Sequence, residues 1–333
     1  MDIMSVNLAT HYRPQKFEDV VGQDVAKTVL KKIAMAPGIS ARAIFLKGSW
    51  GSGKTTLCKI FAKAMNCENF HKLGDVCNEC PKCKEASAKN SQLYFEFDSS
   101  VVGNVDSIRN LQEQLAFAPN GRRVVVFDEI HAASRAAQNA MLKMVEDGIP
   151  NTIFVFASTD DVIPTIKSRS ICVDISTIPH NLIKKRVLEI ANIQGIEVDE
   201  PTLDLIAIKS GGHMRDALSI LQLYQLCGKE GLKSSYNLIV QYFSKLLSKQ
   251  FDEARVLISE IVKYNIVDIR NSIYVFIRNV YAADSESKFY KLQQSGVINK
   301  IFSFFFNPVA QSALKDEVGV ELLLRNLIDK MSR

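Results

Sequence analysis

The chain has 333 residues, of which 47% are hydrophobic and 23% charged, and its net charge is +5. This length exceeds what one hydrophobic core usually supports, so we expect two or three domains in an ordinary globular protein. No uninterrupted apolar run approaches the roughly 18 residues of a membrane span, so we expect a cytoplasmic protein without a membrane partner. The slight basic excess permits a nucleic-acid surface without requiring one.

Short apolar runs alternate with helical patterns in the first half of the chain. Five of these runs predict strands, and they begin at Ala43, Leu93, Arg123, Thr152 and Ile171. Nearly continuous apolar character is expected for strands that helices cover on both faces. The pattern therefore predicts an α/β domain with a parallel five-stranded sheet over residues 1–176.

The second half of the chain shows only helical periodicity. Three short helices fit residues 177–228, and a polar linker is expected to begin at Gly228. Several amphipathic helices are expected over residues 229–333. The last of them carries one apolar stripe, formed by Val320, Leu323, Leu324, Leu327, Ile328 and Met331. Such a stripe indicates an internal core more simply than a contact with another subunit.

The strongest motif is GSWGSGKT, which begins at Gly48 and matches G-x-x-x-x-G-K-[ST] between a predicted strand and a predicted helix. This context disfavours a chance glycine-rich turn. In a phosphate loop, backbone N–H groups surround the phosphates, Lys54 reaches the β- and γ-phosphates, and the Thr55 hydroxyl binds magnesium. The expected nucleotide contacts are Gly48, Trp50, Gly51, Ser52, Gly53, Lys54, Thr55 and Thr56. Trp50 occupies a variable position of the motif, and no role is assigned to its side chain.

A second nucleotide-hydrolase signal is the run VVVFDE, an apolar strand that ends in two acids. Asp128 at the strand end is expected to hold magnesium through water, and Glu129 to act as the general base. Paired acids after a strand are often only solvated, but the phosphate loop upstream favours the catalytic interpretation. His131 is expected to form local hydrogen bonds.

Two arginines are candidate arginine fingers, which are side chains that stabilise the charge of the transition state. A phosphate loop alone hydrolyses nucleotides slowly, and an arginine finger raises the rate roughly 10³–10⁵-fold. Arg169 lies in the run KSRS before the last predicted strand. Arg215 lies in GGHMRDAL at the start of a predicted helix.

Four clustered cysteines predict a metal site. Their C-x-x-C-x-x-C core and lack of an open position favour structural Zn²⁺, with an iron–sulfur cluster or a disulfide as alternatives. The ligands are Cys67, Cys77, Cys80 and Cys83. Within residues 67–85 four acids offset the three lysines, so we expect a structural or subunit-contact role rather than DNA contact; the lysines are Lys72, Lys82 and Lys84, and the acids are Glu68, Asp75, Glu79 and Glu85. The lone cysteines are predicted to be core residues, and they are Cys58, Cys172 and Cys227.

Several segments in order resemble the gamma/tau ATPase subunits of the bacterial DNA polymerase III clamp loader, within the AAA+ class. They are YRPQKFEDVVGQ (from Tyr12), NCEN (from Asn66) with the cysteine segment (residues 67–83), GNVDSIRNLQEQL, FDEIHAASRAAQNAMLKMVED, FASTDDVIPTIKSRS and GGHMRDALSILQ. The resemblance covers about residues 10–226. It implies an AAA+ P-loop domain with a zinc module, a small helical lid over 177–228, and an all-α oligomerisation collar over 229–333.

The resemblance also implies roles for individual residues. Thr159, with Ser158 as the alternative, would sense the γ-phosphate at the end of the fourth strand. Arg169 would reach the ATP site of a neighbouring subunit, and Arg215 would contact the γ-phosphate of its own subunit. The adenine pocket would be lined by Arg13, Pro14, Val20 and Val21.

Three features depart from the family pattern. Ser170 replaces a cysteine after Arg169, although the arginine that carries the chemistry remains. Asp147-Gly148-Ile149-Pro150 stands where a pair of prolines is usual. The chain stops at Arg333 without the tau extension, so we expect a compact version from a bacterium or a bacteriophage.

The function implied is an ATP- and magnesium-dependent motor that opens a sliding clamp and loads it onto primer-template DNA during replication. We expect a hetero-oligomeric ring with other clamp-loader subunits. DNA contact should be mainly to phosphates, with the helix start near 103–106, Arg135 and Lys143 as candidates. The alternatives are another AAA+ DNA motor, for branch migration or helicase loading, and a non-hydrolysing structural ring subunit. The cysteine segment argues against the first alternative, and the intact Lys54, Asp128 and Glu129 argue against the second.

Overall fold

The computed structural model describes residues 7–38, 41–102, 104–228, 232, 235–264, 269, 272–273, 276–277, 280 and 317–332. The chain divides into two compact units, residues 1–222 and 223–333. The predicted boundary at 176/177 lies inside the first unit, and the division into three domains stays a prediction. Each unit is described by itself.

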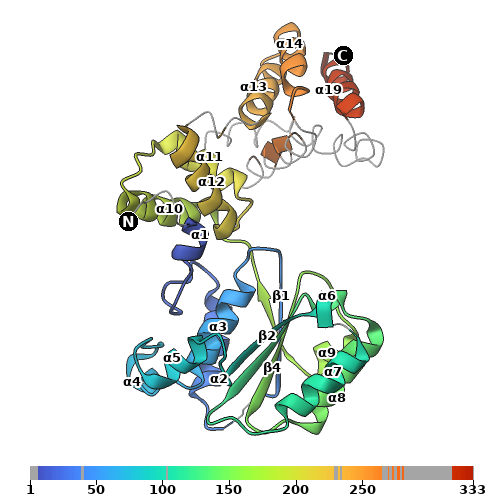
Figure 1. Ribbon diagram of the computed structural model, residues 1–333. Coiled ribbons are helices and arrows are strands. Elements are labelled where there is room, and N and C mark those ends of the chain that lie inside the picture. The colour runs from blue at the N-terminus through green and yellow to red at the C-terminus, as the bar shows by residue number, and fades with distance from the viewer. Residues whose placement is uncertain are drawn as a thin grey trace. The chain divides into compact units, whose positions relative to one another are not determined.

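The first unit is built on a parallel five-stranded sheet with the order β2-β3-β4-β1-β5 (Figure 1). All five strands begin at or within one residue of their predicted starts. The strands are β1 (Ala43–Gly48), β2 (Tyr94–Asp98), β3 (Arg123–Asp128), β4 (Thr152–Ser158) and β5 (Ile171–Ile175). The predicted α/β class with a helical C-terminal region is confirmed.

Helices cover both faces of this sheet (Figure 1). Because side chains alternate along a strand, Ile44 and Leu46 of β1 pack in the core beneath α3, while Phe45 packs in the core beneath α8. The helices of the first face are α2 (Asp24–Met35), α3 (Lys54–Ala64), α4 (Phe70–Leu73) and α5 (Pro81–Ser87). Those of the second face are α6 (Ser99–Val102), α7 (Val105–Leu115), α8 (Arg135–Asp147) and α9 (Pro164–Ser168).

The edge strand β5 explains one wrong prediction. Cys58 is buried as expected, but Cys172 and Cys227 are exposed. Cys172 lies on β5, which pairs only with β1 among the described strands, and Cys227 is the last residue of α12. An apolar neighbourhood in sequence does not bury a residue at the edge of a sheet or at the end of a helix.

Three helices complete the first unit, as the sequence predicts: α10 (His180–Gln194), α11 (Glu200–Lys209) and α12 (Met214–Cys227), whose last residues enter the second unit. Gly195 ends α10 in the left-handed conformation with φ of 66°. The Asp199 side chain accepts a hydrogen bond from the Thr202 N–H and caps α11. Near the N-terminus, the one-turn helix α1 (Leu8–His11) precedes the segment that leads into α2.

The second unit contains α13 (Ser235–Leu247), α14 (Phe251–Ile261) and α19 (Glu317–Ser332). Helix α14 packs against both α13 and α19. All members of the predicted stripe on α19 are buried except Met331, which is partly exposed, so the internal-core interpretation holds for them. The predicted linker after Gly228 lies largely outside the described residues. Within the described part of the chain, every helix is too short or too polar to cross a bilayer.

Candidate functional site

The phosphate-loop motif connects β1 to α3. Gly51 and Gly53 adopt positive φ values of 71° and 101°, which side chains disfavour and glycine permits. Gly48 is packed so closely that a Cβ there would lie 2.5 Å from the Ile175 carbonyl oxygen. The loop therefore needs glycine for both its curvature and its fit against β5.

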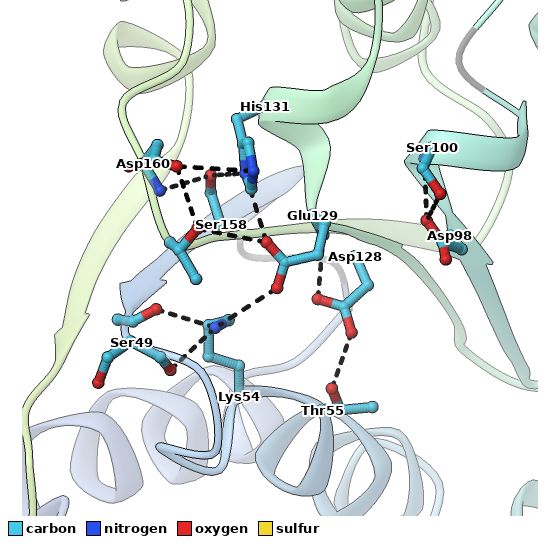
Figure 2. Close-up of polar contacts among 12 residues, drawn as sticks. Ser49, Lys54, Thr55, Asp98, Ser100, Asp128, Glu129, His131, Ser158 and Asp160 are labelled. Carbon is cyan, nitrogen blue, oxygen red and sulfur yellow. Dashed lines mark hydrogen bonds and ion pairs between the residues drawn. The ribbon is translucent and has the colours of Figure 1, made fainter. Parts of the chain in front are cut away.

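Lys54 is buried at the start of α3, with 5% of its surface exposed. Its Nζ donates hydrogen bonds to the Gly48 oxygen at 2.9 Å and to the Ser49 oxygen at 3.2 Å. It also lies 3.8 Å from Oε1 of Glu129 (Figure 2). The ammonium group thus lies inside the loop that the motif predicts to surround phosphates.

The two acids of VVVFDE lie at the carboxyl end of β3, beside this loop. The Thr55 hydroxyl donates to Oδ2 of Asp128 at 2.9 Å, so the two predicted magnesium ligands are adjacent (Figure 2). These are oxygen ligands of the type that magnesium prefers, and they fit such an ion. Glu129 follows with a φ of 49°, an uncommon conformation for this residue type. Its carboxylate faces Lys54 and His131.

A small polar network surrounds Glu129 at the end of β4. His131 Nδ1 lies 3.0 Å from the Ser158 hydroxyl and 3.3 Å from Glu129 Oε2, so His131 makes local contacts as expected. The Thr159 hydroxyl donates to Glu129 Oε2 at 3.4 Å. Ser158 is buried, and its hydroxyl also accepts from the Asp160 N–H (Figure 2). Of the two candidate sensors, Thr159 therefore contacts Glu129 directly, whereas Ser158 contacts it through His131.

A cavity of about 670 Å³ lies over the phosphate loop. Its volume is within the range of small-molecule sites. Most of the predicted nucleotide residues line it, namely Arg13, Pro14, Val20, Val21, Trp50, Gly51, Ser52, Gly53, Lys54, Thr55, Thr56, Asp128, Glu129 and Arg215. Three predicted residues are not part of the lining: Gly48, Thr159 and Arg169.

Arg169 lies just after α9, away from this cavity. Its Nε contacts Oε1 of Glu146 at 2.5 Å, and both side chains are nearly half exposed. Ser170, which stands in place of the family cysteine, donates a hydrogen bond from its hydroxyl to the Ile166 oxygen at 2.7 Å. The serine thus keeps a local contact in the turn that carries the arginine.

Several lining residues were missed from the sequence. Glu96 and Asp98 at the end of β2 add acidic groups, and Arg186 of α10 adds a basic group. Asp98 pairs in register with Asp128 on the neighbouring strand β3, and an accurate alignment of these two strands could have indicated it. Arg186 lies within an ordinary amphipathic helix, and no sequence signal separates it from other surface arginines.

The four predicted metal ligands come together in one cluster. Their sulfur atoms all lie within 4.8 Å of one another, with Cys67–Cys77 at 3.6 Å and Cys77–Cys83 at 3.9 Å. A tetrahedral zinc site with Zn–S bonds of about 2.3 Å spaces its sulfurs by about 3.8 Å. The donor set and spacing therefore fit a structural zinc ion.

Backbone N–H groups surround the cluster. The N–H of Cys80 donates to the Cys77 sulfur at 3.4 Å, and such bonds from Cys80 and Glu79 lower the pKa of Cys77 to about 6. The Cys83 N–H donates to the Cys80 sulfur at 3.4 Å. Burial raises the pKa of Cys67 and that of Cys83. N–H···S bonds stabilise thiolates, the form in which cysteine binds a metal.

The sequence comparisons agree with this geometry. Residues 22–179 match the family described as DNA polymerase III, delta subunit. Subunit tau of Bacillus subtilis is 38% identical over 63% of this chain and 38% of its own length. Subunit gamma of Buchnera aphidicola is 34% identical over 65% of this chain and 60% of its own length. Subunit tau of Escherichia coli is 29% identical over 96% of this chain and 48% of its own length. The chain thus spans less than two thirds of the length of these relatives.

Solved structures give the fold. The RuvB Holliday junction branch migration motor of Thermotoga maritima superimposes with a TM-score of 0.50 at 20% identity, over 64% of this chain and 65% of that one. Identity this low shows the fold alone. Fold and site together define an α/β P-loop protein whose parallel sheet has the fold of that motor. The chain is similar in sequence to the gamma/tau subunits of bacterial DNA polymerase III, and the resemblance predicted from its motifs is confirmed.

Proposed function

We propose that the chain is the ATP-hydrolysing motor subunit of a DNA polymerase clamp loader. It would use ATP to open a sliding clamp and load it onto primer-template DNA during replication. One observation carries this proposal: Lys54, Thr55, Asp128 and Glu129 converge at one cavity in a relative of gamma/tau subunits. The three-part division into residues 1–176, 177–228 and 229–333 and the cytoplasmic location belong to the same proposal.

Nucleotide binding would replace the hydrogen bonds that Lys54 forms within the phosphate loop. Its ammonium group bonds to two carbonyl oxygens of the loop, and the phosphates would take their place. Magnesium, held by Thr55 and Asp128, would neutralise charge that develops on the phosphates. Glu129 would accept a proton from the attacking water, since its carboxylate already lies at the mouth of the loop. Thr159 would orient that carboxylate and respond to the γ-phosphate.

The two arginines would act on the ATP sites of different subunits. Arg215 lines the same cavity as Lys54, which supports a contact with the γ-phosphate of its own subunit. Arg169 lies outside the cavity and is half exposed, which supports a role in a neighbouring subunit's site. To reach a neighbour, Arg169 would exchange its ion pair with Glu146 for the phosphate.

The surface offers candidates for DNA contact. Arg135 and Lys143 are both exposed on α8. Asn104 accepts a hydrogen bond from the Ser107 N–H at 2.8 Å and caps α7, and the first turn of this helix would offer other N–H groups to a phosphate. These contacts would be independent of sequence, as clamp loading requires. The cysteine cluster would hold a structural zinc ion.

The test is ATP hydrolysis by the chain with partner subunits, sliding clamp and primed DNA. We expect clamp and primed DNA together to stimulate hydrolysis, and Lys54→Ala to abolish it. An assembled ring without stimulation would contradict clamp loading, and activity in Lys54→Ala would contradict the assigned site. Mixing Arg169→Ala with Glu129→Ala subunits should restore part of the rate, because one variant supplies the finger and the other the base.

One alternative has an observation in its favour. The matched family is described by the delta subunit, which raises the non-hydrolysing ring subunit as a second candidate. The intact phosphate loop and paired acids oppose it, and an assembled ring in which Glu129→Gln leaves hydrolysis unchanged would favour it. The likeness to a branch migration motor concerns the fold alone, so it does not favour that activity.

A further inference from the structure

The segment 13–21, which we call the wall of the cavity, lines it with both of its ends and is attached through its middle to the cysteine segment, residues 67–83. Arg13 and Pro14 line the cavity at one end of this wall, and Asp19, Val20 and Val21 line it at the other. The residues between them, 15–18, are not part of the lining. Two buried charged side chains fasten these middle residues to residues 67–83.

Lys63 makes the first attachment. It lies on α3, the helix that begins at the phosphate loop, and only 4% of its surface is exposed. Its Nζ donates to the Gln15 backbone oxygen at 2.8 Å, to Gln15 Oε1 at 3.2 Å and to Asn78 Oδ1 at 2.6 Å. An ammonium group has three donors, so these bonds use all of them. Asn78 lies between two of the clustered cysteines and has a φ of 63°.

Asp75 makes the second attachment. It is buried, and its carboxylate accepts from the backbone N–H groups of Phe17 at 3.1 Å and Glu18 at 2.9 Å. It also accepts from its own neighbour, the Val76 N–H, at 2.8 Å. Lys31 of α2 approaches the same carboxylate at 3.6 Å. The turn at residues 17–18 is therefore held by a side chain from the cysteine segment.

Apolar packing joins the same two segments. Phe17 is fully buried and Val20 nearly so, in one hydrophobic cluster with Cys67, Cys80 and Cys83. A buried hydrogen bond to a charged group is costly to lose, because the partner is left without water or another acceptor. The position of the wall thus depends on the shape of the cysteine segment, and four metal–thiolate bonds would fix that shape.

We propose that the cysteine segment positions the wall 13–21 of the nucleotide cavity, with Lys63 and Asp75 as the positioning residues. Metal binding at the cysteines then sets the affinity for the nucleoside part of the ligand, while the phosphate loop binds the phosphates independently. This inference rests on the proposed function, because it takes the ligand to be ATP.

The experiment compares the affinity for ATP with that for inorganic tripolyphosphate, using the full-length chain alone. Trp50 is the only tryptophan and lines the cavity, so its fluorescence reports binding, and calorimetry gives an independent constant. Zinc content is measured on every sample. Asp75→Asn removes acceptor capacity at the turn. Asn78→Gly removes the acceptor that the cysteine segment offers to Lys63, adds no backbone strain, and leaves the bonds from Lys63 to Gln15 in place.

We expect each variant to bind ATP about tenfold more weakly, the equivalent of one buried charged hydrogen bond. The affinity for tripolyphosphate should change less than about twofold, because the phosphate loop is untouched. Lys63→Met should give a larger selective loss if it folds. The matched control is Glu79→Gln, an exposed carboxylate in the same segment, which should leave both affinities unchanged. Removing zinc with a chelator should reproduce the selective loss.

Selective loss of ATP affinity, with or without loss of zinc from the variant, supports the inference. Unchanged ATP affinity in Asp75→Asn and Asn78→Gly overturns it, and so does an equal loss for ATP and tripolyphosphate, which would indicate general damage. An unchanged ATP affinity after complete zinc removal overturns the role of the metal. Failure of the unmodified chain to bind ATP at all would instead contradict the proposed function.

Discussion

The nucleotide cavity and the cysteine cluster are built in opposite ways. The cavity is lined by residues from Asn7 near the N-terminus to Ser219 on α12, and the sheet and its helices bring them together. The cluster takes all four sulfurs from the single stretch Cys67–Cys83. A site made from one stretch depends on local turns, whereas a site made from distant segments depends on the whole sheet and the helices that follow it.

This difference predicts how each site fails. Damage to the cluster should spread only as far as the segments attached to it, which are α3 and the wall 13–21. Damage to one cavity residue should leave the fold intact and remove a single chemical step.

The largest expected effect is that of metal removal on the cysteine segment. Structural zinc contributes roughly 10 kcal/mol to the folding of small zinc peptides. Chelation, or Cys80→Ser with Cys83→Ser, should therefore make the amides of residues 67–87 exchange rapidly with solvent. Hydrogen exchange measured by mass spectrometry would show this, and the amides of β3 and β4 should stay protected.

The control for metal removal is Cys172→Ser, because Cys172 is exposed on β5 and far in sequence from the cluster. It should keep the zinc content and the exchange pattern of the unmodified chain. Slow exchange of residues 67–87 in zinc-free protein would show that the segment folds without a metal.

Next is Glu129→Gln in the cavity. Loss of a general base typically lowers a rate by about 10²–10⁴. We expect this loss in the hydrolysis rate of the assembled complex, with ATP affinity changed less than about threefold, since the neutral amide keeps the size of the side chain. Steady-state hydrolysis and Trp50 fluorescence measure the two quantities. Glu113→Gln, an exposed position on α7, is the matched control, and a comparable rate loss there would remove the special role of Glu129.

A smaller effect is expected when the Arg169–Glu146 ion pair is broken. Both side chains are nearly half exposed, at 45% and 46%, so solvent screens the pair. Its contribution to the free energy of unfolding should be below about 1 kcal/mol. Urea unfolding of Arg169→Ala, Glu146→Ala and the double variant measures this coupling. A coupling of several kcal/mol would mean that Arg169 holds the fold and is not free to reach a neighbour.

The smallest effect concerns acid stability at Asp161. Hydrogen bonds from Lys167 and Lys47 lower the pKa of Asp161 to about 2, below its ordinary value of 3.8. A carboxylate with a lowered pKa stabilises the fold above its ordinary pKa, and this stabilisation is lost as the pH falls toward 2. Asp161→Asn should therefore flatten the pH dependence of the melting temperature between pH 4 and 2. Asp147→Asn, an exposed position, should leave that slope unchanged.

The sequence alone predicted the elements that local patterns encode. Apolar runs fixed the five strands, because strands covered on both faces exclude polar residues. The spacing of Gly53, Lys54 and Thr55 predicted the loop, and the C-x-x-C-x-x-C spacing predicted the cluster, because each constellation forms within a few turns of chain. The predicted burial of Cys172 was wrong, since the order of strands places β5 at an edge.

Only the tertiary structure decided which distant groups meet. It brought Glu96, Asp98 and Arg186 to the cavity and kept Arg169 away from it. It also attached the cysteine segment to the cavity wall through Lys63 and Asp75, two residues that look like ordinary charges in the sequence. Their importance comes from burial, because a charge without water must find fixed partners, and burial is a property of the whole fold.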